Sequence, residues 1–143
     1  GLSLTDPRLL ESTEEFGDDI TVQILSVFPN LVLQQIHNSV ALRLVLPQGP
    51  DKTELQWIYL GFEDDDAAMT ERRLLQSNLV GPAGYISMED GAVGNFVQRA
   101  IVGGEDECSG IEMGGFDHRS DNTRTTEAAI RGFWHAYRPL MGF

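Results

Sequence analysis

The amino-acid sequence predicts an α+β fold in which an antiparallel sheet packs against helices. Three observations support this prediction. Residues 20–62 contain several segments in which side chains alternate with the period of two that is typical of strands. From residue 67 onward, apolar residues recur at helical spacing instead. Strands therefore come first and helices second, without the strand–helix alternation that a parallel sheet requires.

Three or four strands are expected before the acidic cluster at residues 63–66. Ile20 to Val27 and Leu31 to Ile36 are rich in β-branched and aliphatic residues, and the proline-containing break between them fits two strands or one bent strand. Ser39 to Leu46 alternates cleanly, with its leucines on one face. Glu54 to Phe62 alternates as well, and the Pro-Gln-Gly-Pro-Asp turn before it predicts an antiparallel hairpin.

Helices are expected in the second half of the chain. The acidic cluster precedes Ala67 to Leu79, where it would complement the partial positive charge of a helix N-terminus. A Gly-Pro-Ala-Gly turn ends this helix, and a second one is expected from Ser87 to about Ile101. A glycine-rich loop follows. Thr125 or Thr126 can then cap a last helix that bears a bulky apolar stripe.

Length, charge and cysteine content limit the possible functions. The chain has 143 residues, for which one domain is expected, and a formal net charge of −12. This charge argues against nucleic-acid binding, because phosphate contacts require a basic patch. Cys108 is the single cysteine, which excludes an intramolecular disulfide and favours a reducing compartment. Without an apolar run of about 20 residues or a leader-like start, we expect a cytoplasmic protein with no membrane partner.

Several short motifs follow one another along nearly the whole chain. They are SVFPN at 26–30, QIHNSVALRLVLP at 35–47, NLVGPAG at 78–84, the Glu89-Asp90 pair, EMGG at 112–115 and RGFWHAYRPLMG at 131–142. In their order and spacing, they resemble the C-terminal third of the large (alpha) subunit of Rieske-type aromatic-ring-hydroxylating dioxygenases. Within that family, they look most like enzymes that act on salicylate, anthranilate or terephthalate.

The resemblance implies a fold, a reaction and a set of partners. Residues 1–143 would be the C-terminal portion of a helix-grip, START-like catalytic domain, without the N-terminal Rieske domain and the two iron-ligating histidines. The parent protein would be the terminal oxygenase of a dioxygenase or monooxygenase system, which hydroxylates an aromatic substrate with mononuclear Fe(II) and dioxygen. Electrons from NADH would reach its Rieske [2Fe-2S] cluster through a reductase, with or without a ferredoxin. The family also implies an alpha trimer, with or without beta subunits.

Asp90 is the candidate metal ligand. A non-haem Fe(II) oxygenase site takes two imidazoles and one carboxylate, and the resemblance places Asp90 at the carboxylate position. The alternative is a capping box, because Ser87 and Asp90 have the S-x-x-[DE] spacing that ties a carboxylate to its own helix start. The three histidines of the chain follow no recurrent ligand spacing, so they are not expected to replace the missing pair.

The resemblance also places four residues at the substrate pocket, namely Ile24, Gln34, Val80 and Ile86. For the three apolar residues, ordinary core packing is the alternative. Gln34 is different because a polar side chain buried in an apolar strand needs a partner. It therefore predicts a contact with a carboxylate or hydroxyl group of the substrate. No further catalytic residue is expected in this chain.

Hypotheses from other functional classes stay open. A curved antiparallel sheet around a long helix can hold a small molecule without any metal, as a non-catalytic START-like binding module would. An acidic interaction domain rests on the net charge alone. The direction of the Asp90 carboxylate separates the first two, since a bond back to Ser87 favours the binding module. As an oxygenase fragment, the chain should be inactive by itself, because one carboxylate does not hold Fe(II) against water.

Overall fold

The structure, a computed structural model, describes residues 4–104, 106–108, 117–119 and 127–142. The chain divides into two compact units, residues 1–103 and 104–143, which are described separately. The EMGG motif and the expected caps Thr125 and Thr126 lie outside the described residues. Among the helices of the described ranges, none is both long and apolar enough to cross a membrane.

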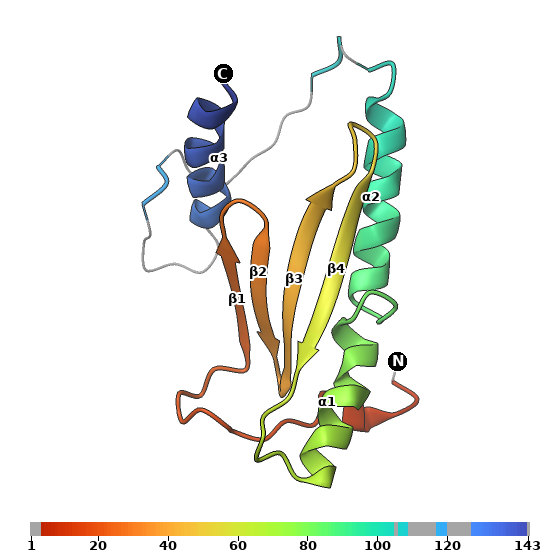
Figure 1. Cartoon of the computed structure of the whole chain (residues 1–143). Helices are drawn as coiled ribbons and strands as arrows, with labels where there is room; N and C mark the ends of the chain where they lie inside the picture. The colour runs from red at the N-terminus through yellow and green to blue at the C-terminus, as the bar shows by residue number, and fades with distance from the viewer. Residues whose placement is uncertain (1–3, 105, 109–116, 120–126, 143) are drawn as a thin grey trace. The chain divides into compact units, whose positions relative to one another are not determined.

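The described part of the first unit contains a four-stranded antiparallel sheet (Figure 1). Its strands are β1 (Val22–Val27), β2 (Leu31–Ile36), β3 (Ser39–Pro47) and β4 (Thr53–Leu60). They lie side by side in sequence order, and each is antiparallel to the next. The break at residues 28–30 is a turn between two strands rather than a bend in one. The expected antiparallel sheet is thus confirmed.

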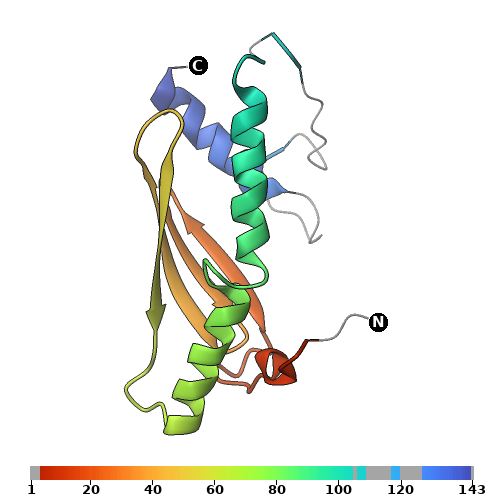
Figure 2. The same cartoon turned by 90° about the vertical axis from the view of Figure 1, so that its right-hand side faces the viewer.

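Three α-helices follow within the described ranges. α1 (Ala67–Val80) and α2 (Ser87–Ile101) belong to the first unit, and α3 (Ala128–Met141) belongs to the second. A short 3-10 helix, η1 (Pro7–Leu10), precedes the sheet. The acidic cluster acts as predicted, because the Asp66 carboxylate caps α1 by accepting a hydrogen bond from the Met69 amide at 2.7 Å. Figure 2 shows α1 continuing into α2 along one side of the sheet.

The strand register defines two faces of the sheet, since directly paired residues point to the same side. Two adjacent rows on one face are Ile24, Gln34, Ala41 and Tyr59, and Ser26, Val32, Arg43 and Trp57. The turn between α1 and α2 approaches this face, because a Cβ atom at Gly81 would collide with the Tyr59 hydroxyl. We call it the helix face. The opposite face bears most of the leucines of the sheet.

Buried side chains of the first unit gather where η1 and β3 meet α1. The apolar ones are Leu9, Leu79 and Val80, with Leu4, Ile36 and Leu75 packed against them. Among the described residues, the buried polar or charged side chains are Gln34, Asn38, Ser39, Arg73 and Gln76. Polar groups cost free energy when they are buried without hydrogen bonds. The hydrogen bonds that Arg73 and Gln76 make to the backbone of Asn38 therefore help to hold α1 on the sheet.

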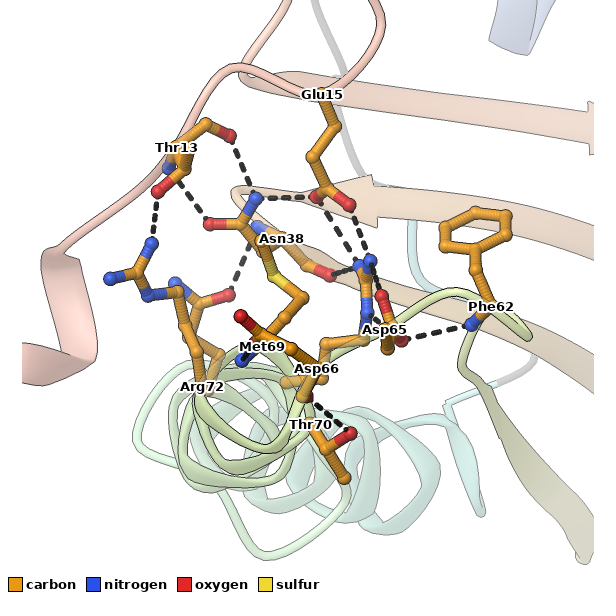
Figure 3. Close-up of polar contacts among 11 residues, drawn as sticks. Thr13, Glu15, Asn38, Phe62, Asp65, Asp66, Met69, Thr70 and Arg72 are labelled. Carbon is orange, nitrogen blue, oxygen red and sulfur yellow. Dashed lines mark hydrogen bonds and ion pairs between the residues drawn. The ribbon is translucent and has the colours of Figure 1, made fainter.

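Arg73 of α1 is the centre of a polar network at this place. Figure 3 labels Glu15, Asn38 and Asp65, which belong to this network. The Arg73 guanidinium donates to the Asp65 carboxylate through Nε at 2.8 Å and Nη2 at 2.7 Å. It also contacts the Glu15 carboxylate and donates to the Asn38 carbonyl oxygen. The Asn38 side chain exchanges two hydrogen bonds with the backbone of Thr13, at 2.8 and 3.0 Å. The network joins the N-terminal segment, the β2–β3 turn and the start of α1.

The described part of the second unit consists mainly of α3. The predicted apolar stripe is present, and its rings Phe133, Trp134 and Tyr137 contact one another with centroids 5.5 to 5.7 Å apart. No side chain of α3 is buried. Arg131 of α3 donates from Nε to the Asp117 carbonyl oxygen. This bond links residues 117–119 to the helix.

Candidate functional site

Asp90 lies in the first turn of α2, and its side chain is exposed. The helix begins after Ile86 without any side-chain cap. The Ser87 hydroxyl donates to the Val80 carbonyl oxygen at 3.0 Å, so it does not pair with Asp90. Within the described part of the chain, the Asp90 carboxylate accepts no hydrogen bond and forms no ion pair. The capping-box alternative is therefore wrong, and this carboxylate is available as a ligand.

Arg43, on the helix face of β3, is the second charged side chain of the candidate site. Burial lowers the pKa of the Arg43 guanidinium, while the charge of Asp90 raises it in part. The guanidinium lies over the ring of Trp57, its partner on β4, at 5.0 Å from the ring centroid. Arg43 Nε is buried and has no hydrogen-bond partner in the described ranges. The result is a partly buried cation whose Nε donor is unused in the described ranges.

Gln34 adds a second unused donor on the same face. Its side chain is 2% exposed, and its Nε2 atom has no hydrogen-bond partner among the described residues. Gln34 pairs with Ala41, which lies two residues before Arg43 on β3. Gln34 and Arg43 are thus diagonal neighbours, which lie about 7–8 Å apart in a sheet. Because buried donors in native proteins find a partner, this pair suits an acceptor-rich group such as a carboxylate.

The other candidate pocket residues take different positions. Ile24 is the direct partner of Gln34 on β1 and is 53% exposed. Ile86, just before α2, is 44% exposed. Val80 is 1% exposed and belongs to the apolar core with Leu9. The structure therefore groups Ile24 with Gln34 and places Val80 in the core. A substrate contact of any of the four residues stays a prediction.

Two histidines that are distant in sequence meet in the second unit. The rings of His118 and His135 stack at 4.2 Å between centroids, and the Asp117 carboxylate lies 3.7 Å from His118 Nδ1. The spacing of His118 and His135 in the sequence did not indicate that their rings would meet. Within the described ranges, however, no group of three or more His, Cys, Asp and Glu side chains could hold a metal. His37, the remaining histidine, directly follows β2, and its backbone amide donates to the Thr21 carbonyl oxygen at 2.7 Å.

The sequence analysis did not single out Arg43 and Trp57. The alternation within each strand does not show which residues of two neighbouring strands lie opposite one another. The register of the β3–β4 hairpin supplies this information, because it sets Arg43 directly opposite Trp57. An arginine and a tryptophan on the same face of a predicted hairpin were the available signal.

A hollow of about 440 Å³ lies at the other end of α1. It is lined by Glu15, Phe16, Phe62, Asp64, Asp65, Asp66 and Met69. Its carboxylates would repel an anionic ligand. Its lining includes neither Asp90 nor Arg43. We therefore do not place the candidate site of Asp90 and Arg43 in this hollow.

Known proteins with similar sequences are large oxygenase subunits. The chain is 58% identical over 139 residues to the terephthalate 1,2-dioxygenase terminal oxygenase component subunit alpha 2 of a Comamonas species. It is 44% identical over 143 residues to the anthranilate 1,2-dioxygenase large subunit of Burkholderia cepacia. It is 37% identical over 142 residues to the salicylate 5-hydroxylase large oxygenase component of a Ralstonia species.

The extent of these alignments defines the relationship. They cover 97%, 100% and 99% of the chain, respectively, but only 34% of each relative. No protein-family model matches the chain. The chain is therefore homologous, over about a third of their length, to the large (alpha) oxygenase subunits of aromatic-ring dioxygenases and hydroxylases.

Proposed function

We propose that the protein containing this chain is the terminal oxygenase of a multicomponent aromatic-ring hydroxylase, and that its substrate is an aromatic carboxylate. The relatives are named for terephthalate, anthranilate and salicylate, and all three compounds are aromatic carboxylates. One structural observation carries the proposal. Arg43 is a partly buried cation whose Nε donor has no partner in the described ranges, and the negative charge of Asp90 acts on it. No observation favours the non-catalytic binding module instead.

The chain is, in this proposal, the C-terminal portion of a helix-grip, START-like catalytic domain. The 143 aligned residues are 34% of the anthranilate relative, so a complete subunit would have about 420 residues. The remaining part would supply the Rieske [2Fe-2S] cluster and the two histidines of the mononuclear site.

Asp90 would hold the mononuclear Fe(II) together with those two imidazoles. The residue fits this role because its carboxylate is exposed, and because it is not engaged in capping α2. When bound there, Fe(II) would supply the activation of dioxygen that hydroxylation of an aromatic ring requires. One carboxylate does not retain Fe(II) in water, so the isolated chain would be inactive and would bind iron poorly.

Arg43 and Gln34 would bind the carboxylate of the substrate. The Arg43 guanidinium supplies charge and a fork of N–H donors that matches a carboxylate. Gln34 supplies a neutral donor from the adjacent strand. Ile24, the neighbour of Gln34, would contact the aromatic ring, and Ile86 would contact it near the metal. Val80 lies in the apolar core, so it would contribute to the pocket through packing.

The proposed partners follow from the class of the relatives. The names "terminal oxygenase component" and "large subunit" of these relatives describe parts of multicomponent systems. We therefore propose that electrons pass from NADH through a reductase, with or without a ferredoxin. The oxygenase would assemble as an alpha trimer, with or without beta subunits.

Oxygen incorporation by the complete subunit tests this function. With its reductase, NADH and isotopically labelled dioxygen, the subunit should transfer label to terephthalate, anthranilate or a similar acid. Replacing Arg43 by glutamine should raise KM for the acid about 10- to 100-fold, since a hydrogen bond to a charged group contributes about 1.5–3 kcal/mol. KM for the neutral amide of the same acid should stay nearly constant. Failure to label any aromatic carboxylate would contradict the proposed activity.

A further inference from the structure

We propose that a cavity between α1 and the β3–β4 hairpin binds a small neutral molecule that consists of one aromatic ring and a hydroxyl group, as phenol does. The cavity has a volume of about 220 Å³. Its lining includes neither Asp90 nor Arg43. The inference therefore goes beyond the proposed function and does not depend on it.

Two elements supply the walls of this cavity. Leu74 and Ser77 of α1 have the three-residue spacing that places side chains on one side of a helix, and both line the cavity. Ser39 of β3 and Tyr59 of β4 line it from the sheet. Tyr59 pairs with Ala41 on the helix face, and Ser39 lies two residues before Ala41, so it points to the same face. The cavity therefore lies between the hairpin and one side of α1.

Ser39 contributes an unused hydroxyl group to the wall. The residue is 1% exposed, and its Oγ atom has no hydrogen-bond partner among the described residues. Buried polar groups in native proteins are normally hydrogen-bonded, so an unpaired one calls for an explanation. A serine hydroxyl can both donate and accept a hydrogen bond. A ligand hydroxyl group, which can do the same, is therefore a suitable partner.

The helix hydroxyl groups in the wall already donate to α1 and its cap. Thr70 Oγ1 donates to the Asp66 carbonyl oxygen at 2.9 Å, and Ser77 Oγ donates to the Leu74 carbonyl oxygen at 2.6 Å. These bonds connect neighbours in sequence and need no ligand. Ser39 is thus the residue of the wall that lacks a partner, and one polar group on the ligand is enough to supply it.

The charges of the wall favour a neutral ligand. Asp65 and Arg73 are the charged residues of the lining, and their side chains form an ion pair at 2.7 Å. The Arg73 guanidinium also contacts the Glu15 carboxylate. A charged ligand would lose hydration in this cavity without gaining a free ionic partner, whereas a neutral molecule avoids this cost. Burial raises the pKa of Tyr59, so this wall residue also stays uncharged at neutral pH.

The size and the remaining wall favour a single ring. Phe62 and Tyr59 contribute aromatic side chains, and Leu60 and Leu74 contribute aliphatic ones. Small-molecule sites typically combine such an apolar lining with a few polar groups. Since an apolar cavity of about 150 Å³ can hold benzene, a cavity of about 220 Å³ has room for one ring with one substituent.

Calorimetry on the complete protein that contains this chain tests the site with three probes of similar size. Phenol carries the hydroxyl group, toluene has nearly the same shape without it, and benzoate is an anion. Phenol should bind with a Kd of roughly 0.1–1 mM. Toluene should bind about 3- to 10-fold more weakly, because it cannot form the hydrogen bond to Ser39. Benzoate should not displace phenol.

Two variants and one control locate the binding. Ser39→Ala should remove the preference for phenol over toluene while changing toluene binding less than about twofold. Without ligand, it should not lower the midpoint of thermal unfolding, since it removes an unpaired buried hydroxyl group. Ser77→Leu should abolish binding of both probes by filling the cavity. Ser26→Ala is the matched control, because Ser26 is an exposed serine of β1 outside the lining, and it should leave both affinities unchanged.

The inference is overturned if phenol shows no saturable binding, which is the result expected if water alone occupies the cavity. It is also overturned if Ser39→Ala weakens phenol and toluene equally, or if Ser77→Leu binds phenol as well as the unaltered protein does. Should Ser77→Leu fail to fold, Thr70→Leu fills the cavity from the same side of α1. Arg43→Gln should not change phenol binding, whereas the proposed function requires it to weaken binding of an aromatic carboxylate. The two proposals can therefore fail separately.

Discussion

Replacing Arg73 by methionine should lower the free energy of unfolding of the first unit by about 3 kcal/mol. The Arg73 side chain is only 7% exposed and serves two carboxylates, those of Asp65 and Glu15. It also donates to the Asn38 carbonyl oxygen. Methionine keeps most of the apolar volume of the side chain but leaves these acceptors without their cation. Two carboxylates would then lie close together around an apolar group.

The expected size of the effect follows from this burial. Removing one member of a buried ion pair costs about 3–5 kcal/mol, and we take the lower limit because parts of the network reach solvent. Such a loss is a large share of the roughly 5–15 kcal/mol that stabilises a typical domain. Arg73→Lys should cost less, about 1–2 kcal/mol, because lysine keeps the charge but cannot form the two parallel hydrogen bonds to Asp65.

Urea unfolding followed by tryptophan fluorescence measures this loss. The neighbouring Arg72 provides a matched control, because it lies on the same helix and its contact with the Thr13 hydroxyl is exposed. Arg72→Met should lower the free energy of unfolding by less than about 1 kcal/mol. If Arg73→Met and Arg72→Met differ by less than about 0.5 kcal/mol, then the buried network does not hold α1 on the sheet.

The remaining predictions concern pH and the turn between α1 and α2. The hydrogen bond from Arg73 lowers the pKa of Asp65 below its ordinary value of 3.8, so its stabilising contribution is complete above that value and is lost as the pH falls below it. Asp65→Asn should therefore flatten the decline in stability between about pH 4 and pH 2, and an unchanged acid limb would contradict this. Gly84→Ala should destabilise the chain by roughly 2 kcal/mol, because its Cβ would lie 2.7 Å from the Leu79 carbonyl group. Gly94→Ala, which meets no atom within 4 Å in the described structure, should stabilise α2 by about 0.5–1 kcal/mol. Thermal unfolding compares these two variants, and equal effects would show that the turn is not tightly packed.

Local patterns were sufficient to predict the secondary structure. Alternation defined β3 and the hairpin, and α2 has the predicted bounds, Ser87–Ile101. The helix start at Asp66 followed from the acidic cluster, because the capping interaction involves only neighbours in sequence. These features depend on residues that are close along the chain, so one sequence is enough to find them.

Features that depend on distant residues could not be predicted in this way. The Arg73 network joins Glu15, Asn38 and Asp65, and nothing in the spacing of these residues indicates that they meet. The same is true of Arg43 and Trp57, whose contact depends on the hairpin register. Ser87 also differed from the expectation, because its hydroxyl donates to the Val80 carbonyl oxygen and does not form a capping box with Asp90. Ser87 and Asp90 have the spacing of a capping box, but the end of α1 supplies a different acceptor.

The role of Asp90 as a metal ligand is the central claim, and the iron content of the complete subunit tests it most directly. Asp90→Ala is compared with Glu89→Ala, which removes the adjacent exposed carboxylate of the same helix turn. We predict that Asp90→Ala loses the mononuclear iron and keeps the absorption of the [2Fe-2S] cluster, while Glu89→Ala keeps both. An Asp90→Ala subunit that retains its full iron content would contradict the account.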